Sequence, residues 1–199
     1  MPLRTVLTFF ALAWSCLGQA PPKLGLYLRF DSPPAPLFVS TLERELSGIL
    51  PIFSTRWIVG ESPVPAATYS RILMVRFHGN CAIAPGDSGP ESDDRIELAD
   101  TVTSQGRILP YTVINCDRLQ AFLRSGGSSR TGQEANLGRA GARLLAHELY
   151  HVLLQTPEHG KKGIAKAVYT PASLLSKSMR FEEGELERIG LRYQSHPRE

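Results

Sequence analysis

The chain has 199 residues, which is enough for one ordinary domain with its own core and short for two. Its hydrophobic fraction of 42% and charged fraction of 21% are typical of a soluble globular protein and exclude the disordered and fibrous classes. The formal net charge of +3 is mild and comes without a run of Lys and Arg, so we expect no nucleic-acid partner.

The N-terminus has the pattern of a signal peptide for export. Arg4 supplies a positive start, residues 6–17 (VLTFFALAWSCL) form an apolar run, and Gly18 and Ala20 offer small residues for cleavage. The apolar run is too short to cross the roughly 30 Å hydrocarbon core of a bilayer as a helix. We therefore expect a secreted or periplasmic protein with no stable membrane insertion once the signal is removed.

On this interpretation residues 1–20 are the signal peptide and residues 21–199 are a single mature domain. Two alternatives remain for the first segment. One is a lipoprotein signal anchored through Cys16, for which Trp14 and Ser15 are a poor lead-in. The other is a buried N-terminal helix.

The first half of the mature chain predicts a strand, a helix and two further strands. Residues 24–30 (LGLYLRF) alternate in part and carry aromatic side chains, which favours a strand. Residues 38–50 place an apolar side chain at every fourth position, with charges between, as an amphipathic helix does. Residues 56–59 and 72–77 are short and rich in residues that favour strands.

The next segment predicts a β-hairpin. Residues 96–102 and 107–114 flank the turn-forming sequence Ser104-Gln105-Gly106. Pro110 cannot donate a hydrogen bond to a neighbouring strand, so we expect the second strand of the hairpin at an edge of the sheet.

The last third of the chain predicts two helices. Residues 133–155 form the most helical stretch, with Thr131 and Glu134 as a capping box at its start and Pro157 beyond its end. Residues 182–191 form a short C-terminal helix. The order of strand, helix, several strands and a long helix predicts an α+β domain in which a mixed sheet packs on helices.

Two cysteines, Cys81 and Cys116, remain after the signal is removed. An even pair in an oxidising compartment predicts a disulfide. Each cysteine follows a run typical of a strand, and neighbouring strands would bring the two within bridging distance. Two free thiols are the alternative, while a cysteine metal site is disfavoured because neither has a second Cys or a His at ligand spacing.

Three of the five histidines lie between positions 147 and 159, and two of them belong to an HExxH motif. His147 and His151 are four residues apart, so on a helix their imidazoles share one face and can bind one Zn²⁺ at about 2.0–2.1 Å. Glu148 leans toward the metal without binding it, which is the position of a general base for a water molecule on zinc. We therefore expect one zinc ion per chain and Glu148 as the catalytic residue.

The alternative is a chance match on a surface helix. The neighbours of the motif are apolar, so this helix is expected to be largely buried: Ala146, Leu149, Val152, Leu153 and Leu154. Two histidines and a glutamate buried together would be costly without a partner that satisfies them, and a metal ion is such a partner.

A catalytic zinc usually keeps three protein ligands and one open position. We favour His159 as the third ligand, since Thr156-Pro157-Glu158 lets the chain turn back under the metal. Glu158 is the candidate for a partner of a ligand N–H. The alternative third ligand is a carboxylate from the C-terminal helix: Glu182, Glu183 or Glu185. The remaining histidines, His78 and His196, are expected to be ordinary loop and tail residues.

These features resemble the zincin metallopeptidases, and more narrowly the metzincin-like branch, in which a third histidine follows the active-site helix. The chain is also similar to a group of small exported bacterial proteins with HExxH, a few apolar residues, a histidine and then Gly-Ile-Met. The matching residues are 147–154 (HELYHVLL), His159 and 163–166 (GIAK). The resemblance implies a zincin-like fold, zinc on all three histidines, and an antiparallel edge strand, assigned to residues 107–114, that aligns a peptide or protein substrate.

Two departures from the family pattern stand out. Leu154 and Pro157 occupy the positions where ordinary metzincins have a glycine and the third histidine, so the turn to the third ligand must be built differently. Ala165 stands where a methionine is expected beneath the metal, and Met179 is too far along to replace it. Tyr169 lies where some relatives place a phenol near the metal, which implies either an oxyanion stabiliser or a packing aromatic.

The sequence therefore predicts a zinc-dependent metallopeptidase that hydrolyses peptide bonds through a polarised water molecule, with Glu148 as general base. One alternative is a non-catalytic exported zinc-binding protein on the same scaffold, suggested by Ala165. Glu148 argues against it, because a purely structural zinc has no use for that residue. Another is an interaction domain that is stabilised by its disulfide and binds no metal, which leaves the clustered histidines unexplained.

Overall fold

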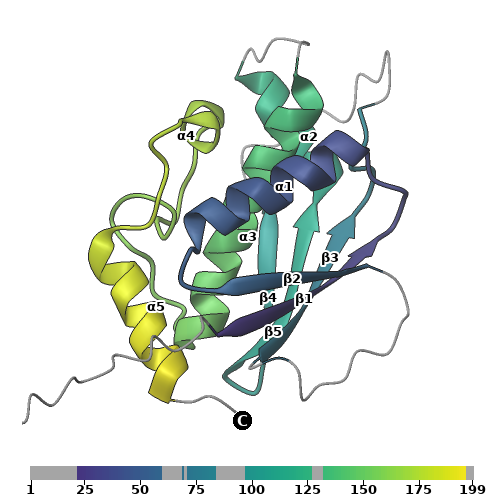
Figure 1. The fold of residues 1–199 in the computed structure, drawn as a ribbon. Coiled ribbons are helices and arrows are strands. Elements are labelled where there is room, and N and C mark those ends of the chain that lie inside the picture. Colours follow the sequence, from purple (N-terminus) through teal and green to yellow (C-terminus); the bar gives the residue numbers. More distant parts are fainter. Residues whose placement is uncertain (1–21, 60–68, 70, 84–96, 127–131, 196–199) are drawn as a thin grey trace, which may run out of the picture.

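The computed structural model describes residues 22–59, 69, 71–83, 97–126 and 132–195 (Figure 1). The expected signal peptide, Thr131 and His196 lie outside the described residues. None of the helices in the described part of the chain has the length and apolar character needed to cross a membrane.

Five strands form one mixed sheet in the spatial order β2-β1-β3-β5-β4. Their bounds are β1 Lys23–Phe30, β2 Ser54–Val59, β3 Arg71–His78, β4 Ala99–Ser104 and β5 Arg107–Asn115. Four strands run parallel to their neighbours, and β4 is antiparallel to β5 at one edge. Alternate residues of β1 and β3 are fully buried, which gives the sheet one apolar face: Leu24, Leu26, Leu28, Leu73, Val75 and Phe77.

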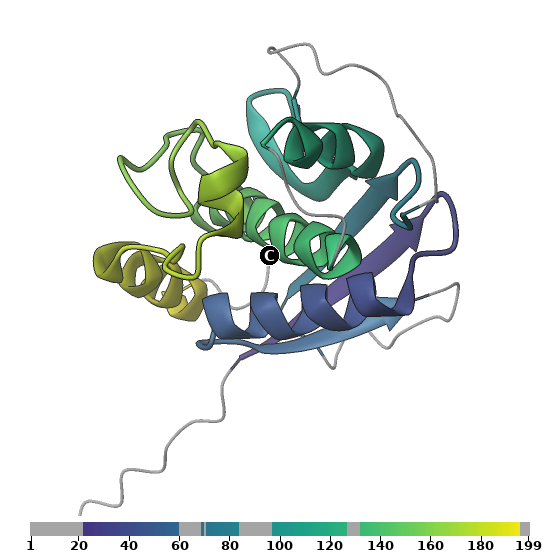
Figure 2. The ribbon, with the colours of Figure 1, turned by 90° about the horizontal axis from the view of Figure 1, so that it is seen from above.

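The described residues form five helices, and the two longest, α1 and α3, lie side by side on the apolar face of the sheet (Figure 2). Their bounds are α1 Pro36–Ile49, α2 Cys116–Ser125, α3 Gln133–Leu154, α4 Pro171–Leu175 and α5 Glu183–Ser195. The predicted strands and helices are found within a few residues of their expected bounds, and the predicted α+β class is confirmed.

Helix α2 was not expected from the sequence. Its local signal is an N-cap: the Asn115 side chain accepts a hydrogen bond from the backbone N–H of Arg118, and Asp117 lies in the positive first turn. Leu119 and Leu123, four residues apart, are both buried. The helix follows β5 without a linker, so the sequence shows no turn or loop signal that would mark where the strand ends and the helix begins.

The hairpin of β4 and β5 is confirmed, but the expected edge position of its second strand is wrong. β5 pairs with both β3 and β4, so the edge strand is β4 and not residues 107–114. Pro110 is tolerated because the register of the β4–β5 pair is irregular between Thr101 and Thr103, and because pairing with β3 begins only at Tyr111.

The expected capping box at the start of α3 is also wrong. The N-cap residue is Gly132, in the left-handed conformation with φ 78°, and among the described residues no side chain caps the helix. Almost every residue from Leu137 to Leu154 is buried, so tertiary packing and not a local cap stabilises α3.

A disulfide joins Cys81 to Cys116, whose Cα atoms are 5.1 Å apart. Cys81 follows β3 and Cys116 follows β5, which are neighbouring parallel strands, so both cysteines leave the sheet at the same end. Both side chains are fully buried. The link ties the start of α2 to the end of β3.

We expect Gly138→Ala to lower the free energy of unfolding by about 1–3 kcal/mol, the usual cost of overpacking. A Cβ at Gly138 would lie 2.5 Å from the carbonyl oxygen of Phe38, and the backbone of α1 cannot step aside as a flexible side chain does. Gly141→Ala is the matched control on the same helix.

The nearest atom to a Cβ at Gly141 would be Leu42 Cδ1 at 3.4 Å, an ordinary contact. Because Ala is the better helix former, this control should be neutral or stabilising by up to about 1 kcal/mol. Urea unfolding of the two variants and the wild type measures both effects. Equal stabilities would contradict the close approach of α1 and α3 at Gly138.

Candidate metal centre

The structure brings three histidines together at the C-terminal half of α3. His147 and His151 lie one turn apart on the helix with exposed fractions of 6% and 8%, whereas His159 follows the helix in an exposed loop. One ring nitrogen from each histidine lies within 4.8 Å of the other two. Among the described residues this is the one group of three or more such side chains that could hold a metal ion.

The turn that returns the chain to the site begins at Gln155. This residue caps α3 in the left-handed conformation, with φ 52° and ψ 46°, which usually costs a non-glycine residue about 1 kcal/mol. Its side-chain amide donates hydrogen bonds to the carbonyls of Ile108 at 3.1 Å and Val152 at 2.9 Å. These bonds hold the helix end against β5, so a helix longer than the family pattern still places His159 beside the other two histidines.

Backbone carbonyls fix the orientation of both buried imidazoles. Nδ1 of His147 lies 2.8 Å from the carbonyl oxygen of Ile164, and Nδ1 of His151 lies 2.7 Å from that of Thr156. Because a carbonyl oxygen only accepts, each Nδ1 carries the hydrogen. In a neutral imidazole the other nitrogen, Nε2, is then a bare acceptor.

The two Nε2 atoms face each other at 3.0 Å. Burial lowers the pKa of His147 to about 4 and also lowers that of His151, so both rings are neutral at neutral pH. Two neutral acceptors at this distance have no hydrogen between them and repel. A cation bound by both lone pairs removes that conflict, so the donors in this structure fit a metal ion.

Glu148 lies beside these histidines with an exposed fraction of 6%. The hydroxyl of Thr101 on β4 donates a hydrogen bond of 2.5 Å to its Oε2. Burial raises the pKa of Glu148 to about 7, and the negative charges of Asp100 and Glu97 on the neighbouring strand segment act in the same direction. The carboxyl group therefore changes its protonation state near neutral pH.

The floor of the site is built from backbone instead of a thioether. The Ile164 carbonyl accepts hydrogen bonds from His147 and from the Tyr169 hydroxyl, and Ala165 beside it is fully buried. The carbonyl oxygen of Ala165 accepts a 2.7 Å hydrogen bond from the N–H of Gly160, next to His159. Without a methionine, this turn still connects two of the three histidines.

Tyr169 lies on the Nδ1 side of His147, where its hydroxyl is 2.9 Å from that nitrogen. Burial, above all, raises the pKa of this phenol. The Tyr169 hydroxyl and Nδ1 of His147 both donate to the carbonyl oxygen of Ile164, so the phenol shares the acceptor that orients the imidazole. Its expected role as an oxyanion stabiliser stays a prediction, and it requires the hydroxyl to leave the Ile164 carbonyl.

The carboxylates and the other histidine considered from the sequence have different surroundings. Glu185 is buried, but its Oε2 accepts a hydrogen bond from the N–H of Glu182 at 2.9 Å, at the start of α5. Glu158 is exposed, and Thr156 rather than Glu158 accepts from His151. His78 lies 2.6 Å from the carboxylate of Asp31, at the end of the sheet.

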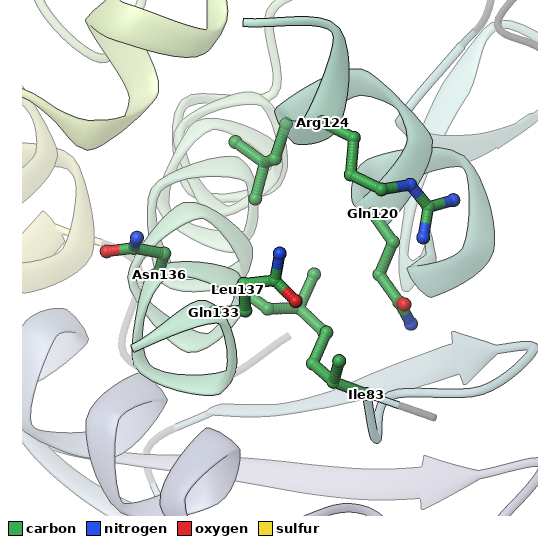
Figure 3. Close-up of a pocket in the computed structure, with 7 residues that line it drawn as sticks. Ile83, Gln120, Arg124, Gln133, Asn136 and Leu137 are labelled. Atoms are coloured by element: carbon green, nitrogen blue, oxygen red, sulfur yellow. The ribbon is translucent and has the colours of Figure 1, made fainter. Parts of the chain in front are cut away.

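A cleft of about 490 Å³ opens over the three histidines and Glu148. One wall is β4 with the residues before it, and the other is the segment from Ala167 to Tyr169. A second hollow, between α2 and α3, is lined by Gln120, Gln133 and Leu137 among others (Figure 3). It measures about 20 Å³, room for about one water molecule, so it is too small for a substrate.

Comparisons with known proteins support the fold. No protein-family model matches the chain, and no curated protein matches its sequence. Among solved structures, the crystal structure of archaemetzincin from Methanopyrus kandleri is similar, with a TM-score of 0.50 over 87% of this chain and 96% of that chain, at 14% identity. The predicted zincin-like fold is thereby confirmed.

The raised pKa of Glu148 makes the stability of the metal-free protein depend on pH. The folded value of about 7 exceeds the ordinary 4.5, so the stabilising contribution of the protonated carboxyl is complete below pH 4.5 and is lost as the pH rises through 7. Glu148→Gln keeps a neutral side chain and should gain stability relative to the wild type with rising pH.

Between the two pKa values this relative gain should reach about 3 kcal/mol, from about 1.4 kcal/mol for each pKa unit. Urea unfolding in chelator at a series of pH values measures it. The lowered pKa of His147 makes stability rise with pH instead. This effect is common to the wild type and the variant, so it cancels in the difference between their stabilities. A stability difference independent of pH would contradict the burial of an ionisable Glu148.

Proposed function

We propose that this protein is a zinc-dependent peptidase that cleaves peptide or protein substrates outside the cytoplasm, with Glu148 as its general base. The observation that carries the proposal is the pair of buried, unprotonated Nε2 atoms at 3.0 Å, next to a buried carboxyl group in an open cleft. The export signal predicted for residues 1–20 supports the location.

The donor set favours zinc over harder cations. Three imidazoles suit zinc, whereas calcium and magnesium take oxygen ligands. His147, His151 and His159 would hold one ion and leave a position open toward the cleft, as in catalytic zinc sites. Bound there, zinc would polarise a water molecule and the carbonyl group of the substrate.

Glu148 would transfer the proton. Its Oε2 is held by Thr101, so Oε1 is the oxygen left to accept a proton from water and later deliver it to the leaving amine. In the metal-free protein burial raises the pKa of Glu148 to about 7, so the group can bind and release a proton near neutral pH.

The edge strand β4 supports a peptide as the substrate. It is antiparallel to β5, lines the cleft and has no strand on its outer side in the described part of the chain. Its free backbone groups could pair with an extended peptide and carry one peptide bond over the histidines. The sequence resemblance implied such a strand at residues 107–114; because β4 is the edge strand beside the cleft, we propose β4 for this role instead.

A non-catalytic exported zinc protein is the second candidate, and Ala165 at the floor of the site is the observation that favours it. The buried Glu148 favours the peptidase, because burying a carboxyl group costs stability and a structural metal site gains nothing from it. Zinc content and turnover separate the two candidates.

We expect about one zinc ion per chain in protein purified without chelator, and a much weaker site in His159→Ala, which removes one of three ligands. His147→Ala should lose the metal and the stability that binding adds. Elemental analysis and competition with a zinc indicator measure both. His78→Ala, which alters a histidine bound to Asp31, is the matched control and should keep its zinc. A metal-free wild type would contradict the proposal.

We expect Glu148→Gln to keep its zinc and to lose turnover by a factor of about 10²–10⁴, the usual contribution of general acid–base catalysis. Hydrolysis of fluorescently labelled casein provides the measurement. Glu187→Gln, at an exposed position of α5, is the matched control and should retain full activity. Full activity in Glu148→Gln would rule out the mechanism, and a zinc-loaded wild type that cleaves nothing would favour the non-catalytic candidate.

A further inference from the structure

Thr101 connects the edge strand to the proposed base, Glu148. It lies on β4 opposite Thr112 of β5, and both threonines point toward α3. Its Oγ1 is 2.5 Å from Oε2 of Glu148 and 3.3 Å from Oγ1 of Thr112. Thr112 has an exposed fraction of 1%, so the pair is shielded from bulk water on the β5 side.

The hydrogens of the two hydroxyl groups can be assigned from their partners. The hydroxyl of Thr112 donates to the carbonyl oxygen of Asp100 at 2.8 Å, and that oxygen can only accept. Its single hydrogen is thereby used, so Thr112 has none left for Thr101. Thr101 therefore has two acceptors, Oγ1 of Thr112 at 3.3 Å and Oε2 of Glu148 at 2.5 Å, and its hydrogen is directed at the nearer, carboxylate oxygen in a charge-assisted hydrogen bond.

This arrangement restricts a side chain that is otherwise flexible. Glutamate has three rotatable bonds, whereas the β-branched side chain of Thr101 is stiff. Residues of β4 before and after Thr101 pair with β5, which fixes the backbone at this position. One carboxylate oxygen accepts the hydrogen bond from Thr101, and the other has no hydrogen-bond partner among the described residues. Placement of a base within about 0.5 Å requires support of this kind.

We propose that Thr101 is the positioning residue for Glu148, so the strand that would receive the substrate also holds the base. This inference rests on the proposed peptidase function for its catalytic consequence. The same backbone segment, β4, would then position both the bound peptide and the carboxylate of Glu148. The peptide bond to be cut and the general base would thus be held at a fixed position relative to each other.

A double-mutant cycle tests the contact without zinc or substrate. Thr101→Val should shift the unfolding equilibrium constant of the metal-free protein about tenfold at pH 8, and much less in a Glu148→Ala background, because the carboxylate is then gone. Thr55→Val is the matched control. It lies on β2 at the opposite edge of the sheet, and its buried hydroxyl has no hydrogen-bond partner among the described residues.

The control should not lower stability in either background. Additive effects of Thr101→Val and Glu148→Ala would overturn the proposal, because a residue that merely packs in the strand shows no coupling to the carboxylate.

The catalytic consequence is tested on the zinc-loaded protein, with a quenched fluorescent peptide taken from the casein segment that the wild type cuts. Thr101→Val should lower kcat at least tenfold, while KM and the zinc dissociation constant stay within about twofold. Thr101→Ser keeps the hydroxyl and should restore most of kcat. Thr55→Val should match the wild type in kcat and KM.

Two results distinguish this inference from the proposed function. If the wild type cuts no peptide but the cycle shows coupling, the peptidase proposal fails and the Thr101–Glu148 contact stands. If the wild type is active and Thr101→Val changes kcat no more than Thr55→Val does, the positioning role is overturned while the peptidase proposal stands. Failure of Thr101→Ser to restore kcat would also overturn the role of the hydroxyl.

Discussion

The site depends on two neutral imidazoles buried on one helix with their bare Nε2 atoms 3.0 Å apart. Much of the surrounding chain serves to hold that arrangement. The carbonyl groups of Thr156 and Ile164 keep the hydrogens on Nδ1, and the left-handed turn at Gln155 places the first of these carbonyls. The arrangement is unfavourable by itself, since two acceptors face each other without a hydrogen, and a bound cation would turn it into a favourable one.

Helix α3 has to serve the core and the site at once. Its N-terminal half packs so closely on α1 that Gly138 leaves no room for a methyl group, and this close packing stabilises a helix that has no side-chain cap. Its C-terminal half buries two histidines and a glutamate, which cost stability unless they are satisfied. The packing of the apolar N-terminal half thus offsets the loss of folding stability caused by the buried polar side chains of the C-terminal half.

The edge of the sheet is the second element of the site. β4 carries Thr101, which donates a hydrogen bond to Glu148, and several residues of this strand line the cleft. The irregular register around Pro110 lets β5 pair on both sides, and β4 is therefore left as the edge strand.

The sequence by itself determined what depends on near neighbours in the chain: the strands and helices with clear periodicity, the α+β class, and the spacing that puts His147 and His151 on one face of α3. The tertiary structure decided the edge strand, the meeting of His159 with the helix and the contact of Thr101 with Glu148. These features join residues through turns and strand pairings whose geometry no local pattern encodes, because a carbonyl or a hydroxyl contributes only where the fold places it.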